Sequence, residues 1–487
     1  MSTIKEYLSE LSGRRVTVIG MGVSNIPLIK MLLRAGVEVT VRDRSPRERL
    51  AEQAQELESL GARLILGEDY LKDLPEELIF RTPGLSPNTP ELLDAVQRGA
   101  ALSSEMEVFF QTCPGRLIGV TGSDGKTTTT TIVAEFLKEA GKNVYVGGNI
   151  GKPLLADVID MVEEDYAVLE LSSFQLMTME QSPHIAVVTN ISPNHLDYHH
   201  TMEEYRDAKG LLFRQCETAV LNLDDEAGRW YRERAACPVF TYSENKDYAD
   251  LTAKNIRLFP GHVEFEAVSQ EDIQRIHLPI PGGFTIYNAL AAAACGLCLG
   301  LELREIAAAL RCAHGVKGRV EVVPTPTAYT VLIDYAHSPN ALENVLLTAR
   351  DFTAGRLICL FGCGGDRDRT KRPLMGAVVR ELADAAVVTS DNPRTEDPWA
   401  IIQDILSGMS GPGGEIHIEP DRPQAIRWAL AQGRPGDVIV LAGKGHETYQ
   451  EVNGVQYPMD EREIVADYFE KRAQRRERAG NLPAGVV

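Results

Sequence analysis

A short run of glycine, lysine and threonine residues has the plainest chemistry in this sequence. Residues 121–130 are TGSDGKTTTT, after a predicted apolar strand and at the start of a predicted helix. The glycines let backbone amides approach phosphate oxygens, the lysine suits the β- and γ-phosphates, and a threonine hydroxyl suits Mg²⁺. The spacing is G-x-x-G-K-T, shorter than usual, because Val120 stands where the first glycine would be. The residues predicted to bind ATP are Gly122, Ser123, Asp124, Gly125, Lys126, Thr127 and Thr128.

Three more residues have types that would complete such a site. Glu170 closes the strand YAVLE and His195 follows the strand HIAVVTNIS, and the carboxyl ends of parallel strands face one crevice. Lys209 lies on a predicted helix, where a solvated lysine is an equally good interpretation. Singly, a strand-end Glu is usually structural and a lone His usually a hydrogen-bonding residue. Together the residues indicate Mg-ATP phosphoryl transfer, which kinases, NTPases and ligases share.

The N-terminal segment predicts a β-α-β unit. Its first strand begins at Val16 and its second ends at Asp43, with a glycine-rich turn and an amphipathic helix between them. Gly20 and Gly22 fit a dinucleotide fingerprint whose third place is Asn25, so the fingerprint is incomplete. Asp43 could accept hydrogen bonds from a ribose or base, although a turn-forming role explains it equally well. The loop 81–90, with Thr82 and Gly84, could line the same crevice.

Strands and helices alternate along the rest of the chain, which predicts an α/β protein. We expect three domains: a Rossmann-like domain over 1–112, a P-loop ATPase domain with a mostly parallel sheet over 113–314, and a Rossmann-like domain over 315–487. A single helix is expected over 288–312. The C-terminal strands are expected in YTVLIDYA, RLICLFG, AAVVTSD and DVIVLAG.

Composition excludes several classes of protein. The net charge of −19 opposes non-specific binding of nucleic acid, which needs a basic surface. No apolar run is long enough for a membrane span, and the N-terminus has no signal-peptide pattern, so we expect a cytoplasmic protein. The eight Cys are scattered and predict reduced thiols, with Cys295 and Cys298 inside a buried helix rather than at a metal.

Five ordered motifs, TGSDGKTTTT, GGNIGKPLL, LELSSFQL, NISPNHLDYH and YRDAK, resemble those of the Mur ligases, which build the peptidoglycan stem peptide. The resemblance implies that ATP phosphorylates an acceptor carboxylate and that an amino acid then attacks the acyl phosphate. It implies two Mg²⁺ ions, a UDP-N-acetylmuramoyl peptide acceptor and an amino acid donor. We expect a monomer, although no motif reports the oligomeric state.

The resemblance also assigns roles residue by residue. Lys126 and Thr127 would bind the β/γ-phosphates and Mg²⁺, Glu170 the first Mg²⁺ and His195 the second, and Lys209 would be carbamylated to ligate metal. Asn149, Ser172 and Ser173 would contact the acceptor. Asn288 would bind adenine, Arg319 the phosphates and Asp334 the ribose; the family often has Asn where Thr285 stands, which weakens the adenine assignment.

Two branches of the family are resembled by different parts of the chain. The first 200 or so residues resemble the D-glutamate-adding members. The last 270 or so, with TSDNPRTEDP and LAGKGHETYQ, resemble the diaminopimelate-adding members, in which Asn392, Arg394, Gly443 and Glu447 would hold the donor. Because the first domain sets how far the acceptor reaches, we expect a D-glutamate ligase acting on UDP-N-acetylmuramoyl-L-alanine. The alternatives are the diaminopimelate ligase, or a hybrid joined near residues 205–230.

Two rival functions remain open. Folylpolyglutamate synthase shares the mechanism, but the dinucleotide-like first domain argues against it. A catalytically silent nucleotide-binding scaffold would bind ATP without amine-dependent turnover.

Overall fold

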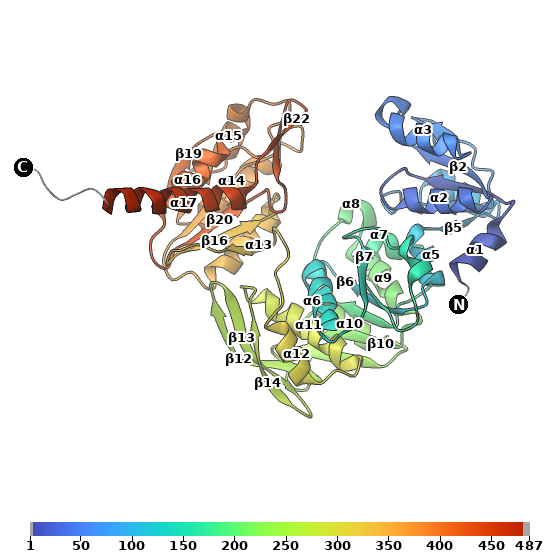
Figure 1. The fold of residues 1–487 in the computed structure, drawn as a ribbon, viewed down its shortest axis with the longest axis horizontal. Helices are drawn as coiled ribbons and strands as arrows, with labels where there is room; N and C mark the ends of the chain where they lie inside the picture. The colour runs from blue at the N-terminus through green and yellow to red at the C-terminus, as the bar shows by residue number, and fades with distance from the viewer. Residues whose placement is uncertain (1–2, 481–487) are drawn as a thin grey trace, which may run out of the picture. The chain divides into compact units, whose positions relative to one another are not determined.

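The computed structural model describes residues 3–480, and the chain forms two compact units, each assembled from several stretches of sequence (Figure 1). Unit 1 consists of Met1–Lys254, Glu266–Ile276 and Tyr287–Leu310, and unit 2 of Asn255–Phe265, His277–Ile286 and Arg311–Val487. Three sheets of mainly parallel strands with helices on their faces make up most of the structure, which agrees with the α/β prediction.

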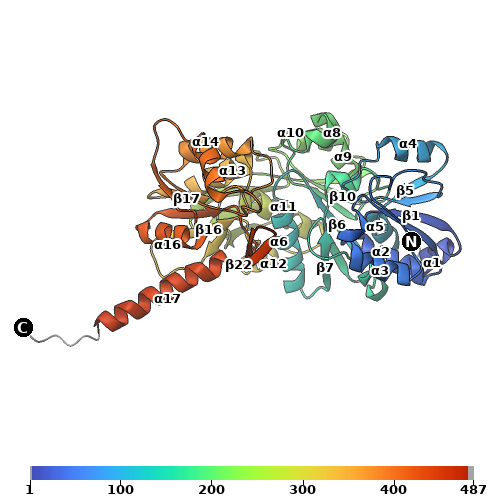
Figure 2. The same ribbon diagram turned by 90° about the horizontal axis from the view of Figure 1, so that it is seen from above.

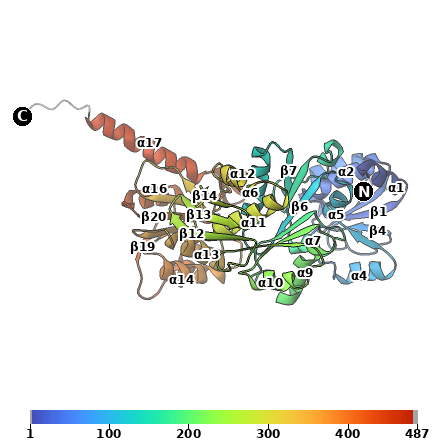
Figure 3. The same ribbon diagram turned by 90° about the horizontal axis from the view of Figure 1, so that it is seen from below.

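The first sheet is wholly parallel and has the strand order β3-β2-β1-β4-β5. Its strands are β1 (Arg15–Ile19), β2 (Glu38–Asp43), β3 (Arg63–Leu66), β4 (Leu78–Phe80) and β5 (Ala101–Ser103). Its helices are α1 (Ile4–Leu11), α2 (Asn25–Arg34), α3 (Ala51–Ser59), α4 (Pro90–Gln97) and α5 (Glu105–Thr112), with a 3₁₀ turn at Arg47–Arg49. Helices α2 and α3 cover one face of the sheet and α4 the other, each with its own apolar core (Figures 2 and 3). The predicted β-α-β unit is therefore confirmed.

The second sheet has nine strands in the order β14-β13-β12-β11-β10-β9-β6-β8-β7. They are β6 (Arg116–Thr121), β7 (Val144–Gly148), β8 (Tyr166–Glu170), β9 (Ile185–Val188), β10 (Thr218–Asn222), β11 (Val239–Ser243), β12 (Leu251–Phe259), β13 (His262–Ser269) and β14 (Ile273–Leu278). The helices between them are α6 (Lys126–Glu139), α7 (Ser173–Leu176), α8 (Leu196–His199), α9 (Met202–Gly210) and α10 (Glu226–Arg232), with 3₁₀ turns at Asp157–Asp160 and Leu211–Phe213. The pairs from β7 to β12 are parallel. Strand β6 runs directly into the glycine loop and α6, as predicted.

Two features of this region differ from prediction. Strands β12, β13 and β14 form an edge of consecutive strands joined by turns of two and three residues, which only antiparallel pairing allows. The helix expected over 288–312 is two helices, α11 (Phe284–Cys298) and α12 (Leu303–Leu310). Gly300, with φ +81°, lies between them and ends the helical path. Cys295 is buried in α11, which confirms its structural interpretation.

The third sheet has the order β15-β16-β20-β17-β18-β19, with only β15 antiparallel to its neighbour. Its strands are β15 (Glu321–Val323), β16 (Thr330–Asp334), β17 (Leu357–Phe361), β18 (Ala385–Val388), β19 (Glu415–Ile418) and β20 (Val438–Ala442), and a separate ribbon pairs β21 (Tyr449–Val452) with β22 (Val455–Pro458). The helices are α13 (Pro339–Arg350), α14 (Lys371–Leu382), α15 (Pro398–Leu406), α16 (Arg422–Gln432) and α17 (Glu461–Gly480). Helices α13, α14 and α15 pack on one face and α16 and α17 on the other. All four predicted strands are present, whereas β15 and β19 were not predicted.

No helix in the described part of the chain has the length and apolar character needed to cross a membrane.

Candidate functional site

The glycine loop between β6 and α6 has a backbone that only glycine tolerates at two positions. Gly122 has φ +145°, and a Cβ there would lie 1.9 Å from Oγ1 of Thr189. Gly125 has φ +79°, precedes the first turn of α6, and a Cβ there would lie 2.2 Å from Oδ1 of Asn288. The loop thus wraps tightly around the helix N-terminus, where backbone amides and the helix dipole favour an anion.

The loop is fastened to the end of β9. The backbone amide of Asp124 donates to Oδ1 of Asn190 at 3.0 Å, and Thr189 Oγ1 donates to the Asp124 carbonyl at 2.6 Å. Ser123 Oγ donates to the carbonyl of Ser192 at 3.0 Å. Lys126 Nζ donates to the Ser123 carbonyl at 2.8 Å, so its ammonium lies over the loop. The loop is therefore held in shape before any ligand arrives.

A carboxylate, a hydroxyl and an amide meet beside this loop. Glu170, the buried last residue of β8, accepts a hydrogen bond from Thr127 Oγ1 at 2.6 Å on one oxygen. Its other oxygen accepts from Asn149 Nδ2 at 2.8 Å. The sheet order β6-β8-β7 explains the convergence, because the three residues follow the carboxyl ends of adjacent strands. Hard oxygen donors at this spacing fit a Mg²⁺ ion, which binds oxygen ligands at about 2.1 Å.

Lys209 is not a solvated lysine. Its side chain is buried, and Nζ donates to the Gly122 carbonyl at 2.9 Å and to Thr121 Oγ1 at 3.2 Å. Burial, followed by the charge of Lys126, holds the pKa of Lys209 well below its usual value, against the opposing effect of Glu170. The structure therefore brings Lys209 to the loop as an amine that loses its proton readily.

His195 lies beside this cluster in an unusual backbone conformation. It has φ +53° and precedes α8. Its imidazole packs edge-on against Phe174 at 4.9 Å and lies 6.4 Å from the ring of Tyr205. Tyr205, which sequence reasoning missed, has its hydroxyl 3.2 Å from Ser123 Oγ and so links His195 to the loop.

A second histidine, His199, also belongs to this region and gave no separate signal in the sequence. It is buried, and its Nε2 lies 2.8 Å from Ser173 Oγ. The neighbouring Ser172 begins α7 and forms a reciprocal cap with Gln175. Both predicted acceptor-binding serines therefore have structural partners at this site.

Asn288 has an unsatisfied donor. Its Nδ2 is buried and has no hydrogen-bond partner among the residues that the structure describes. A buried amide without an acceptor is uncommon in folded proteins and indicates a place for a ligand. Thr285 instead donates to the Gly282 carbonyl at 2.6 Å and is fully buried.

The N-terminal crevice is built around the predicted glycine turn. Asp43 accepts from the backbone amide of Met21 at 2.8 Å, so its carboxylate holds the turn. Asn25, in the third fingerprint place, is buried and donates to the carbonyls of Ile19 and Gly20, which explains why glycine is not needed there. Thr82 adjoins the same turn, since its amide donates to the Ile19 carbonyl at 3.1 Å. Gly84 follows on the exposed part of that loop.

Arg81 fastens this loop to helix α7, which follows β8, and was missed by sequence reasoning. Its side chain is buried and donates to the Leu85 carbonyl at 2.6 Å and to the Phe174 carbonyl at 2.7 Å. Phe174 also packs on His195, so a single arginine joins the N-terminal loop to the helix behind the phosphate site.

Unit 2 holds a separate polar cluster at the ends of β18 and β20. Lys444 is fully buried, and its Nζ donates to Glu447 Oε2 at 2.6 Å and to Asn392 Oδ1 at 2.8 Å. Asn392 Nδ2 donates to the same Glu447 oxygen at 3.0 Å. Burial would raise the pKa of Glu447, but the hydrogen bonds from Lys444 and Asn392 outweigh it and leave this pKa lowered. Lys444, which sequence reasoning missed, therefore keeps Glu447 ionised.

Arg394 and Gly443 adjoin this cluster. Arg394 has φ +52°, and its side chain donates to Glu451 at 3.1 Å and to the Gly365 carbonyl at 2.8 Å. Gly443 has φ +112°, and a Cβ there would lie 2.6 Å from a carboxylate oxygen of Asp391. The four predicted donor-binding residues thus come from two loops at one edge of the sheet.

Arg319 and Asp334 lie together in unit 2. The guanidinium of Arg319 lies 5.4 Å from the ring centre of Tyr335. Asp334 is buried, and its two oxygens accept from the backbone amides of Val320 and Ala336, each at 2.8 Å. Burial raises the pKa of Asp334, against these hydrogen bonds.

Three protein-family models match consecutive parts of the chain. Residues 14–104 match the Mur ligase MurD-like N-terminal domain, 120–296 the Mur ligase middle domain, and 318–445 the Mur ligase glutamate ligase domain. A curated relative from Geobacillus thermodenitrificans (strain NG80-2) is 40% identical over 421 residues, covering 80% of this chain and 86% of the relative. The chain belongs to the Mur ligase family. It is therefore an ATP-dependent ligase of peptidoglycan precursor synthesis, as the resemblance predicted.

Two curated relatives of this Mur ligase carry the same name. The Geobacillus protein is named UDP-N-acetylmuramoyl-L-alanyl-D-glutamate–2,6-diaminopimelate ligase. A protein of the same name from Bacillus velezensis (strain DSM 23117 / BGSC 10A6 / LMG 26770 / FZB42) is 38% identical over 444 residues, covering 85% of this chain and 87% of the relative.

Solved structures agree with the fold of this Mur ligase. A structure of a ligase with that name matches with a TM-score of 0.62 and 28% identity, covering 95% of this chain and 93% of the other. UDP-N-acetylmuramate-alanine ligase from Thermotoga maritima matches with a TM-score of 0.58 at 21% identity, over 95% of this chain and 99% of the other, which supports the fold alone. The predicted three-domain α/β fold is confirmed.

The expectation that this Mur ligase adds D-glutamate to UDP-N-acetylmuramoyl-L-alanine is wrong. Relatives at 38–40% identity over most of the chain, and the matching solved structure, are diaminopimelate ligases. The expectation gave the most weight to the first 112 residues as a measure of acceptor length. The residues predicted to contact the amino acid lie in unit 2 instead, where Asn392 is hydrogen-bonded to Glu447.

Proposed function

We propose that this Mur ligase joins meso-diaminopimelate to UDP-N-acetylmuramoyl-L-alanyl-D-glutamate with hydrolysis of ATP to ADP and phosphate. The main support is the name shared by relatives that are 38–40% identical over four-fifths or more of this chain. The loops of unit 2 support it independently, because their polar groups suit a dicarboxylic diamino acid.

The donor would be held by opposite charges. The Arg394 guanidinium is a planar fork that matches a carboxylate, and its present partner Glu451 leaves room for exchange because the pair is partly exposed. Glu447, kept ionised by Lys444, would accept from the donor's distal ammonium. Asn392 would contact the same end of the donor, and Gly443 would give it backbone access.

The acceptor would lie between the first sheet and the loops after β7 and β8, all within unit 1. Asp43, Thr82 and Gly84 would bind its nucleotide part, and Asn149, Ser172 and Ser173 its sugar and peptide. Residues 14–104 match the MurD-like N-terminal model, whereas the relatives' names refer to the longer dipeptide acceptor. We infer that a MurD-type first domain is joined here to the body of a diaminopimelate ligase.

ATP would bind along the loop from Gly122 to Thr128, with its adenine against the unsatisfied amide of Asn288, all within unit 1. Thr127 and Glu170 would hold one Mg²⁺ and His195 a second. Bound Mg²⁺ would supply charge that stabilises the phosphates and the leaving group. Lys126 would add a fixed positive charge where negative charge develops.

The chain's own groups would organise two successive displacements. A carboxylate oxygen of the acceptor attacks the γ-phosphorus of ATP, the bond to ADP breaks, and an acyl phosphate forms. The donor amine then attacks the acyl carbon, phosphate leaves, and the nitrogen loses a proton as the amide forms. The order follows from chemistry, because phosphorylation turns a poor leaving group into a good one. The loop and Lys126 would hold the phosphates for the first displacement.

Lys209 would act as a carbamate. Burial and the charge of Lys126 lower the pKa of Lys209 and so favour the neutral amine, which can attack CO₂, giving a carbamate and releasing a proton. The carbamate would be an anion beside Lys126, where a protonated Lys209 would be repelled, and it would add an oxygen ligand for Mg²⁺.

A crossed assay tests the assignment. Two acceptors, UDP-N-acetylmuramoyl-L-alanine with and without D-glutamate attached, are each combined with D-glutamate or meso-diaminopimelate, and product is identified by mass. We expect product only from the longer acceptor with diaminopimelate. Product from the shorter acceptor with either donor would contradict the proposal, and ATP binding without product in any combination would favour a silent scaffold.

A further inference from the structure

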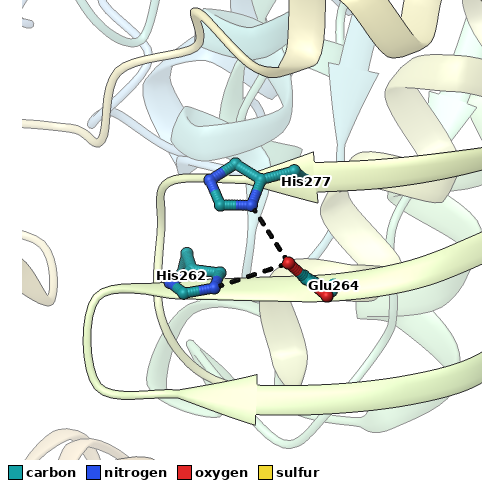
Figure 4. Close-up of side chains that lie close together, drawn as sticks. All are labelled: His262, Glu264 and His277. Carbon is teal, nitrogen blue, oxygen red and sulfur yellow. Dashed lines mark hydrogen bonds and ion pairs between the residues drawn. The ribbon is translucent and has the colours of Figure 1, made fainter.

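Three side chains with good metal-binding atoms converge on the edge of the second sheet, and none of them is a predicted residue of the phosphate site. His262 and Glu264 lie on β13 and His277 on the adjacent strand β14 (Figure 4). Along β13 the alternate residues Val263 and Phe265 are buried, so His262 and Glu264 share the more exposed face. All three residues belong to unit 2.

The spacing of their ligand atoms is close to that of a metal site. One carboxylate oxygen of Glu264 lies 3.8 Å from His262 Nε2 and 3.5 Å from His277 Nδ1 (Figure 4). The three ligand atoms all lie within 4.8 Å of one another. Ligands about 2.1 Å from a tetrahedral ion are about 3.4 Å apart. Small side-chain rotations would therefore complete the arrangement.

Ring packing restricts the positions of both imidazoles. The His262 ring stacks on Phe259 with centres 4.3 Å apart and planes at 12°, which limits its rotation. The ring centres of His262 and His277 lie 4.5 Å apart, so the two imidazoles already lie side by side.

We propose that His262, Glu264 and His277 bind a Zn²⁺ ion that joins β13 to β14. Two imidazoles and a carboxylate favour a borderline cation such as Zn²⁺ over Mg²⁺, which prefers oxygen ligands alone. The side chains keep between 28% and 41% of their surface exposed, so an ion can enter from solvent and water can occupy the fourth position. The site is independent of the proposed amino acid specificity.

Co²⁺ is a suitable probe because its visible absorption reports ligand number and geometry. The full chain, without a polyhistidine tag and with the exposed Cys312 replaced by Ser, is titrated with Co²⁺ in millimolar Mg²⁺, and Zn²⁺ is then added as competitor. We expect one Co²⁺ with intense visible bands of four-coordinate type, displaced by one equivalent of Zn²⁺.

The variants H262A, H277A and E264Q identify the ligands. Each should weaken Co²⁺ binding by about 100-fold or more, since even loss of a supporting contact costs 10–100-fold. H314A, which removes an exposed histidine elsewhere in unit 2, is the matched control and should bind as the parent does. Equal binding by the parent and the H262A/H277A double variant would overturn the proposal.

A structural readout separates this site from adventitious binding. Hydrogen exchange of residues 260–278 should slow by about tenfold when Zn²⁺ is added to the parent chain, and should not change in the double variant. No slowing in the parent, with metal bound elsewhere, would also overturn the proposal. Melting curves taken without metal show whether each variant is folded.

Discussion

Lys444 gives the sharpest test of the donor site, because it is a fully buried ammonium whose removal leaves Glu447 with one hydrogen bond. In Lys444→Met the side-chain volume is nearly kept, while the donors to Glu447 at 2.6 Å and to Asn392 at 2.8 Å are lost. Removing one partner of a buried ion pair costs about 3–5 kcal/mol. Glu447 is 16% exposed and keeps the Asn392 bond, so the lower end applies.

We expect the complex with the donor to be destabilised by about 2 kcal/mol of this cost, because the freed Glu447 carboxylate can turn toward water. That corresponds to a fall of about 30-fold in kcat/KM for diaminopimelate. The assay is phosphate release at saturating ATP and acceptor with the donor varied. KM for ATP should stay within about twofold of the parent, because the phosphate loop is untouched.

The pH profile gives a second readout. Loss of the Lys444 hydrogen bond leaves burial as the main influence on Glu447, so its pKa rises. Glu447 must be ionised to accept from an ammonium, and the acidic limb of kcat/KM should therefore move to higher pH. Lys471→Met removes an exposed partner of Asp467 and is the control, with no expected change beyond twofold. A Lys444→Met enzyme with the donor KM and acidic limb of this control would refute the reasoning.

Three other predictions concern unit 1. Gly125→Ala should weaken ATP binding, measured by calorimetry, by more than about tenfold, because its Cβ would lie 2.2 Å from Asn288; Gly141→Ala has similar backbone strain with open space and should bind ATP normally. Lys209→Ala should abolish turnover and regain part of it with a short-chain carboxylate; unchanged activity would rule out the carbamate. Burial raises the pKa of Glu105 from 4.5 to about 7, so the folded chain favours the protonated carboxyl. Its contribution to the free energy of unfolding is fully present below pH 4.5 and is lost as the pH rises through 7. Glu105→Gln should cancel about 3 kcal/mol of that loss in urea unfolding at pH 8 compared with pH 4.5, and an unchanged pH dependence would count against it.

The fold was largely predictable where local pattern and topology agree. Continuous apolar strands followed by glycine-rich turns predicted the parallel sheets, and the loop around Gly122 and Gly125 was located because its residues are neighbours in sequence. The hairpins at β12–β14 were missed although Pro260 and Gly261 are a turn signal, because the prediction followed continuous apolar strands and passed over strands in which apolar and polar residues alternate. Gly300 inside an alanine-rich run was not recognised as the end of a helix.

The candidate site was predictable in residue type more than in environment. Glu170 and Thr127 were paired correctly because both follow adjacent strands. The burial of Lys209 and Lys444 could not be predicted, since a lysine on a helix or after a strand is usually solvated. His262 and His277 gave no signal either, because only the hairpin brings together residues so far apart in the sequence.

The way the chain alternates between the two compact units limits how evolution or an engineer could recombine it. The chain crosses between the two units five times, at 254/255, 265/266, 276/277, 286/287 and 310/311. A recombination point within this region would therefore interrupt both units. The first sheet, by contrast, uses only residues 15–103 in one uninterrupted stretch. A single exchange of DNA could replace that stretch without cutting a strand of any other sheet, which offers a simple route to a MurD-like beginning on this enzyme.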